Sequence, residues 1–233
     1  MILTAHQVAY LPWLGYFSKI QAADVFVLLD TAQHETGSFE NRNRIMTGTG
    51  EQWLTVPVHS AGHIGKPVHT LAVANEHRWR RKHWTALRQA YGKAPHWPEV
   101  ESWLGPYYDK LYGLREWIEG ETLPSLCVPM LRDHLRALGI ERDILFASDL
   151  KISSSGSDFL VDLCERLGAD SFLFGGKGRA YVDREAFKRA GIKPLFQTAL
   201  SERPPHLAAV HYLAKHGAKF TRGMLSDWGV SYE

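Results

Sequence analysis

The first thirty or so residues alternate between two hydrophobic periods. Apolar runs at residues 2–5 and 25–29 predict strands, and apolar positions at helical spacing follow Pro12 between them. Proline has the backbone angle that the first turn of a helix requires. A strand, helix and strand in this order favour a parallel pair with a right-handed crossover. The loop before Pro12 is therefore predicted to lie at the carboxyl end of a parallel strand, where open α/β sheets bind ligands.

The remaining pattern alternates between strands and helices around a helical interruption. Residues 53–58 and 69–73 are predicted strands, and residues 31–44 are polar enough to predict a long loop. Residues 77–139 show helical periodicity, with Gly and Pro breaks that indicate three or four helices. Strands and helices then alternate at residues 144–147, 158–167, 171–174, 183–190 and 193–197. We predict an α/β fold with an open, mostly parallel sheet, formed by residues 1–233 as a single domain with a helical insertion or cap at residues 76–139.

Composition narrows the class of protein. A formal charge of +2 is too small to indicate nucleic-acid binding by itself, so a nucleic-acid partner is not expected. The two cysteines, Cys127 and Cys164, lie in apolar stretches and are predicted to be reduced core thiols. The sequence shows neither an N-terminal export signal nor an apolar run long enough for a membrane span, so we expect a soluble, cytoplasmic protein.

Polar and aromatic residues gather around the predicted first loop and just after the second strand. The predicted substrate-binding and catalytic residues there are His6, Gln7, Tyr10, Trp13, Tyr16 and Asp30. A His-Gln pair at the open end of a strand favours a role facing a ligand over a purely structural one. For Asp30 a site role and a turn or helix-cap role both remain open.

Two further segments carry groups suited to anions. The polar run Asn41, Arg42, Asn43 and Arg44 offers amide and guanidinium donors to phosphate or carboxylate oxygens. We expect the two arginines to point to opposite sides, with Arg44 facing the cleft. The second segment is a Gly-rich loop between a strand and a helix, and its predicted phosphate-binding residues are Gly175, Gly176, Lys177, Gly178, Arg179 and Tyr181. This loop lacks the spacing of a P-loop or of a dinucleotide fingerprint.

Other clusters favour structural interpretations. The spacing of His59, His63 and His69 fits no familiar zinc site, and no metal is predicted. Ser155 with Asp158, like Asp183 further on, is typical of the start of a helix. The basic run at residues 76–93 is interleaved with Trp79, Trp84 and Tyr91, which suits either a nucleotide- or RNA-binding face or a packed amphipathic helix with a solvated basic side.

Much of the chain resembles the WbqC-like protein family. The matching segments are HQVAYLPWLGYFSKIQAADVFVLLD, NRNRI, WLTVPV, GSDFLVDLCERLGAD and FGGKGRAYVD. Val8 stands where the family commonly has proline. The resemblance implies a link to O-antigen and surface-polysaccharide clusters, and a glycine or other aminoacyl transferase activity. The first loop is also similar to the opening of nucleotidyltransferase-like Rossmann variants, although Tyr16 stands where those enzymes usually carry a second histidine.

We therefore expect transfer or ligation of an acyl or aminoacyl group, glycyl among them, onto an amino or hydroxyl group of a sugar or nucleotide-sugar. In an acyl-adenylate route, ATP with Mg²⁺ would be used, and His6 and Arg44 would stabilise the transferring phosphoryl group. In the other route an acyl carrier or charged tRNA would be the donor and His6 a general base. The alternative is a non-catalytic nucleotide- or RNA-binding module that uses the basic helix at residues 76–93.

Overall fold

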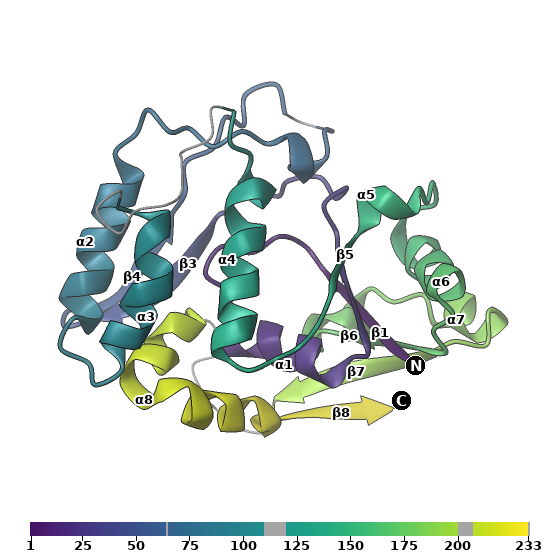
Figure 1. The fold of residues 1–233 in the computed structure, drawn as a ribbon. Helices are drawn as coiled ribbons and strands as arrows, with labels where there is room; N and C mark the ends of the chain where they lie inside the picture. Colours follow the sequence, from purple (N-terminus) through teal and green to yellow (C-terminus); the bar gives the residue numbers. More distant parts are fainter. Residues whose placement is uncertain (64, 110–119, 200–206, 233) are drawn as a thin grey trace.

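A computed structural model gives the structure of residues 1–63, 65–109, 120–199 and 207–232 (Figure 1). The first part of the chain forms β1 (Ile2–His6), α1 (Leu14–Ala22), β2 (Val25–Leu28), β3 (Arg42–Thr47), β4 (Gly50–Thr55), η1 (Val68–Thr70), α2 (Trp79–Tyr91), α3 (Trp97–Leu104) and η2 (Gly105–Tyr107). The second part forms α4 (Leu123–Ala137), β5 (Ile144–Phe146), α5 (Ala147–Leu150), α6 (Gly156–Leu167), β6 (Ser171–Phe174), η4 (Gly176–Ala180), α7 (Arg184–Arg189), β7 (Lys193–Ala199), α8 (Ala209–Met224), η5 (Leu225–Asp227) and β8 (Trp228–Tyr232).

The main sheet has the strand order β5-β2-β1-β6-β7-β8. Its first five strands are parallel, and β8 runs antiparallel to β7. Counted along the chain, this order is 3-2-1-4-5-6, the arrangement of doubly wound folds. The predicted open, mostly parallel α/β sheet is thus confirmed. The order reverses between β1 and β6, so ligands of such a fold would bind near the carboxyl ends of these two strands.

Strands β1 and β6 separate soon after they pair. Their pairing starts at Ile2 and ends at Leu3, whereas β1 pairs with β2 as far as His6. The sheet therefore opens between β1 and β6 at the point where the strand order reverses, and we call this opening the switch-point crevice.

Side chains take up the carbonyl groups that the split leaves without a ladder partner. Thr4 Oγ1 donates to the Leu173 carbonyl at 2.7 Å, and Lys19 Nζ donates to the Ala5 carbonyl at 2.8 Å. Buried carbonyl groups need such partners, because leaving them unpaired costs free energy. These two bonds keep the split edge of β1 satisfied without closing it.

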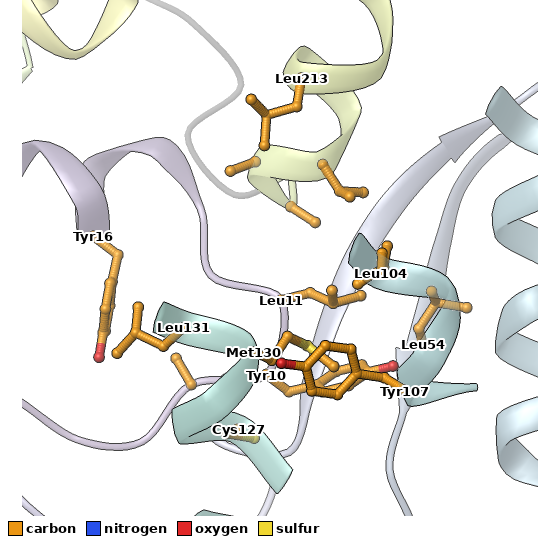
Figure 2. Packing of buried hydrophobic residues seen from close by; sticks show 14 of the residues in the cluster. Tyr10, Leu11, Tyr16, Leu54, Leu104, Tyr107, Cys127, Met130, Leu131 and Leu213 are labelled. Carbon is orange, nitrogen blue, oxygen red and sulfur yellow. The ribbon is translucent and has the colours of Figure 1, made fainter. Parts of the chain in front are cut away.

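Alternate residues of strand β2 belong to two hydrophobic clusters. Phe26 and Leu28 of β2 pack with α1, α2, α3, α4, α8 and the β3-β4 hairpin, whereas Val27 packs with α6 and α7. Figure 2 shows side chains from the loop after β1 packed among those of β4, α3, α4 and α8. The predicted helical region at residues 76–139 contains α2, α3 and α4, and its residues 110–119 lie outside the described part.

Three segments differ from the prediction. Strand β3 begins at Arg42, inside the predicted loop at residues 31–44. Residues 69–73 were expected as a strand, but η1 occupies Val68–Thr70, because the Leu71 N–H closes a short turn onto the Val68 carbonyl. The predicted pattern also had no counterpart of α8 and β8, although β8 closes the sheet beside β7.

Candidate functional site

His6 ends β1 at the switch-point crevice, with its ring against Trp13 and Tyr16 at centroid distances of 5.5 and 4.6 Å. Its Nδ1 lies 3.2 Å from the Gln7 carbonyl oxygen. A carbonyl oxygen only accepts, so Nδ1 carries the proton and Nε2 presents a lone pair. This Nε2 has no hydrogen-bond partner among the described residues.

Burial keeps the His6 imidazole neutral. Burial first, and the positive charge of Lys19 second, lower the pKa of His6 from 6.5 to about 3. Lys19 is itself buried, has no ion-pair partner in the described chain, and burial lowers its pKa from 10.5 to about 7. Near neutral pH the site thus holds a neutral imidazole beside a lysine close to the midpoint of its own titration.

Gln7 and Tyr16 frame His6 in different ways. Gln7 is partly exposed, and its side-chain amide makes no hydrogen bond within the described residues, so this amide is open to a ligand. Tyr16 is buried and its hydroxyl donates to the Gln7 carbonyl at 3.3 Å. Burial raises the pKa of Tyr16 well above its ordinary value. Tyr16 therefore supports the loop, and direct substrate contact, which the sequence predicted for it, does not fit its burial.

Tyr10, expected to bind substrate, lies in the core instead. Its side chain is fully buried, and its hydroxyl bonds to His83 Nδ1 at 2.8 Å and to the Tyr108 hydroxyl. Figure 2 shows Tyr10 beside Met130 and Tyr107 in this core cluster. Tyr10 is thus enclosed in the core, and its role in substrate binding stays a prediction.

The two asparagines of the polar run are also structural. Asn41 Nδ2 donates to the Val56 carbonyl at 2.9 Å, and Asn43 Nδ2 donates to the Leu11 carbonyl at 2.5 Å. Both side chains are buried. Asn41 joins the two ends of the β3-β4 hairpin and Asn43 fixes the hairpin to the loop after β1, and the expectation that they bind substrate stays a prediction.

Asp30 follows β2 at the same edge of the sheet as His6. Its two carboxylate oxygens accept hydrogen bonds from the Ser148 backbone N–H at 3.0 Å and from the Ser148 hydroxyl at 2.7 Å. Ser148 lies in the first turn of α5. This geometry favours the cap interpretation of Asp30 over the catalytic one.

Arg42 and Arg44 lie on the same side of β3. Their guanidinium carbons stand 4.4 and 5.2 Å from the centroid of the Trp53 ring. The expectation that they point to opposite sides was wrong, because residues two apart in an extended chain share a face. Arg42 donates to the Gly37 carbonyl, and Arg44 pairs with Glu51.

The hairpin adjoins the His6 site through aromatic contacts. Phe39 lies 5.7 Å from Trp53 and 5.3 Å from Trp13, measured between ring centroids. Trp53 is 43% exposed. Arg42 and Arg44 are therefore linked to the site only through Trp53 and Phe39, and no described contact joins either arginine to His6.

The Gly-rich loop follows β6 on the other side of the crevice. A Cβ on Gly178 would meet Phe174 Cβ at 2.4 Å, so this glycine lets the loop fold back onto its own strand. A Cβ on Gly175 would meet nothing within 4 Å. The loop backbone at Gly175 is thus open, while Gly178 has a packing reason of its own.

The side chains of this loop divide into bound and free groups. Arg179 donates to the Ser231 hydroxyl at 2.6 Å and stacks over Phe196, so its expected phosphate contact competes with these partners. Lys177 is exposed, and Tyr181 is 66% exposed. Lys177 is the cation of the loop that is best placed to meet an anion from solvent.

Sequence reasoning missed two residues that complete the crevice, Gln197 and Trp228. Gln197 of β7 donates from Nε2 to the Gly15 carbonyl at 2.8 Å, and the indole nitrogens of Trp13 and Trp228 both approach Gly15. A glutamine that directly follows the apolar residues Leu195 and Phe196 in a predicted strand was a usable signal for Gln197. Trp228 gave no signal, because its neighbourhood depends on the antiparallel pairing of β8.

A cleft of about 810 Å³ also lies between α2 and α3, lined by Arg81, Arg88, Trp84, Trp97 and Tyr108 among others. The three aromatic side chains in it are only 2 to 5% exposed. They cannot offer a ring face to a base or sugar, so this basic face lacks the stacking surfaces that single-stranded nucleic acid uses.

Metal and membrane features can be stated for the described residues. In this part of the chain, no group of three or more His, Cys, Asp or Glu side chains is arranged to hold a metal ion. Among the described helices, none combines the length and apolar character that a bilayer crossing requires. Both cysteines are buried free thiols.

Comparison with known proteins places the chain among relatives. A family model described as "WbqC-like protein family" matches residues 7–211. A protein of Mycobacterium tuberculosis (strain ATCC 25618 / H37Rv), named "Uncharacterized protein Rv1507c", is 32% identical over 184 residues, which cover 79% of this chain and 76% of that protein. No solved structure matches the chain. The match begins at the residue after His6 and runs through the first loop, the hairpin and the Gly-rich loop, and the chain belongs to the WbqC-like protein family.

Proposed function

We propose that this protein transfers an acyl or aminoacyl group, glycyl among them, to an amino or hydroxyl group at the switch-point crevice. The observation that carries the proposal is the His6 Nε2 lone pair, which stands unpartnered where β1 and β6 separate. An accepting nitrogen at this place can orient a nucleophile that carries a hydrogen. A sugar or nucleotide-sugar of surface polysaccharide is the proposed acceptor, and this part rests on the family resemblance alone.

In the adenylate route, a carboxylate oxygen of the acyl donor bonds to the α-phosphorus of ATP and pyrophosphate leaves. The acceptor nitrogen or oxygen then bonds to the acyl carbon, AMP leaves, and the acceptor proton passes to His6 Nε2. A pKa near 3 makes His6 a weak base in the empty site. A negatively charged substrate beside it would stabilise the imidazolium and raise that pKa.

The phosphates would face the Gly-rich loop across the crevice. Gly176 and Lys177 are exposed there and Gly175 is partly exposed, and the proposed donors are the backbone N–H groups of the two glycines and the ammonium group of Lys177. ATP would enter as a co-substrate together with Mg²⁺. If the donor is instead a carrier thioester or a charged tRNA, the second step is unchanged, except that a thiol or the tRNA leaves.

Two assays separate these steps. ATP-pyrophosphate exchange with a panel of amino acids measures adenylate formation, and hydroxamate formation with hydroxylamine as acceptor measures acyl transfer. We expect exchange with at least one amino acid, and His6→Ala should lower hydroxamate formation by about 10²-fold or more while ATP affinity stays within about tenfold.

His77→Ala is the matched control, because His77 is an exposed histidine distant in sequence from the site. It should behave as the parent protein. An absence of exchange, combined with hydroxamate formation from a glycyl thioester, would select the thioester route. If wild-type protein formed no hydroxamate from ATP and amino acids, from thioesters or from charged tRNA, the proposed function would be rejected.

A further inference from the structure

Two indole nitrogens come together beside His6. A Cβ on Gly15 would lie 3.0 Å from Trp13 Nε1 and 3.2 Å from Trp228 Nε1. Because both nitrogens lie about 3 Å from the same point, they are at most about 6 Å apart. Two N–H groups at this spacing can donate to a single oxygen atom, since an N–H···O bond spans about 2.9 Å.

Neither indole N–H has a hydrogen-bond partner among the described residues. Both side chains are partly exposed. A tryptophan N–H can only donate, and it usually finds an acceptor when the ring is largely packed. Two unused donors whose nitrogen atoms lie close to one glycine therefore point to an acceptor from outside the chain.

The surroundings favour an acceptor with negative charge. The Trp13 ring stands edge-on to His6 at 5.5 Å, and the charge that acts on His6 is the ammonium group of Lys19. A cation in a low-dielectric interior stabilises a nearby oxyanion more than it would in water. Gly15 has no side chain to occupy the space between the two indoles.

We propose that Trp13 and Trp228 form an oxyanion-binding pair for the acyl oxygen of the substrate, a role that rests on the proposed function. When the acceptor bonds to the acyl carbon, the carbonyl electron pair moves onto this oxygen, and the acceptor proton passes to His6. The carbonyl reforms as the leaving group departs. Neutral donors fixed in place suit an oxygen whose charge develops only during the reaction.

The test uses indole N–H signals in spectra of ¹⁵N-labelled protein, with Trp13→Phe and Trp228→Phe to assign the two signals. The probes are glycyl-sulfamoyl adenosine, which carries an acyl oxygen, and pyrophosphate, which does not. The Trp13 and Trp228 signals should move with the first probe and stay with the second. Trp103→Phe is the control, because Trp103 packs against His134 in the helical region.

Kinetics give the second readout. Trp228→Phe keeps the ring and loses the N–H, and Gly15→Ala fills the space between the donors, so each should lower kcat for hydroxamate formation at least about tenfold with little change in KM for ATP. Trp103→Phe should leave kcat unchanged. If Trp228→Phe does not fold, the same kcat and KM measurements on Trp13→Phe provide the test.

The outcomes separate the two ideas. The variants are assayed with the acyl donor that the wild-type protein uses. If a folded Trp228→Phe or Trp13→Phe variant keeps the wild-type kcat, the oxyanion pair is overturned and the proposed function stands. The oxyanion pair is also overturned if glycyl-sulfamoyl adenosine binds and shifts other indole N–H signals, while the signals of Trp13 and Trp228 do not move. A wild-type protein that transfers no acyl group from any donor overturns both.

Discussion

At the scale of single residues, Lys19 is the group whose position needs the most explanation. Its ammonium group is buried against one carbonyl oxygen, and among the described residues it has no carboxylate partner. Burying a cation is costly, which is why its pKa falls to about 7. In return the lysine satisfies the Ala5 carbonyl at the split in the sheet and places positive charge next to His6.

This cost predicts how stability depends on pH. In the unfolded chain Lys19 keeps a pKa of 10.5, and in the folded protein burial lowers it to about 7. Between these values the unfolded state binds more protons, so the contribution of Lys19 makes the protein more stable as pH rises from 7. Lys19→Met should remove this slope, and by leaving the Ala5 carbonyl unpaired it should add a pH-independent cost of about 1–3 kcal/mol.

Urea unfolding at about pH 7 and about pH 9 measures the slope. Lys82→Met, which changes an exposed helical lysine, is the control and should keep the wild-type slope. If Lys19→Met retained that slope as well, the buried ammonium group would not be the titrating group.

Residue type predicted the place of His6 but not which of its neighbours are open to a ligand. Gln7 and Trp13 are partly exposed, whereas Tyr10 and Tyr16 of the same short segment are buried. An aromatic side chain with a polar edge suits a pocket and a core equally well. The hydrogen bond of Tyr10 to His83, which decides the case, joins residues far apart in sequence.

At the scale of elements, strand β3 shows why a polar strand escapes detection. Buried and partly exposed residues alternate along β3, as in a strand with one face in the core, and Arg42 and Arg44 lie on its outward face. However, the inward position 43 is an asparagine, and the residue just before the strand is the buried Asn41. Both amides bond to backbone carbonyls, which allows these polar side chains to be buried. The buried face of the strand therefore has no apolar pattern in the sequence. Helix α8 was missed for a different reason. Gly217 interrupts its backbone with a φ of 75°, and a glycine inside a helical pattern weakens the prediction of a helix.

The Gly-rich loop allows a matched pair of substitutions. Gly178→Ala would force a Cβ to within 2.4 Å of Phe174 Cβ, so the free energy of unfolding should fall by about 1–3 kcal/mol. Gly175→Ala meets no atom within 4 Å and should leave stability nearly unchanged. Urea unfolding of both variants measures this, and equal losses would mean that Gly178 does not set the path of the loop.

At the scale of the whole molecule, the crevice joins opposite ends of the chain. The end of β1 brings His6, the loop after it brings Trp13, the fifth parallel strand brings Gln197, and the antiparallel last strand brings Trp228. The sequence predicted the parallel strands, because each carries an apolar run between turn residues. It could not predict Trp228 as a neighbour of Trp13, since that contact depends on β8 adding to the edge of the sheet.

The contact between Gln197 and Gly15 holds the two sides of this crevice together. Gln197 Nε2 donates to the Gly15 carbonyl at 2.8 Å across a separation of 182 residues, and the side chain is buried. Gln197→Ala removes this buried bond, while the Gly15 carbonyl keeps its helical bond within α1, so the free energy of unfolding should fall by about 0.5–1.5 kcal/mol. It should also lower affinity for glycyl-sulfamoyl adenosine, because α1 would no longer be fixed to β7.

Thr198→Ala is the control for this last prediction, since Thr198 makes a longer 3.4 Å bond to the Ser231 hydroxyl and lies next in the same strand. Its cost should stay below about 1 kcal/mol, with the affinity unchanged. Urea unfolding and calorimetric titration measure the two quantities. A Gln197→Ala variant as stable as Thr198→Ala, with parental affinity, would show that the crevice keeps its shape without this bond.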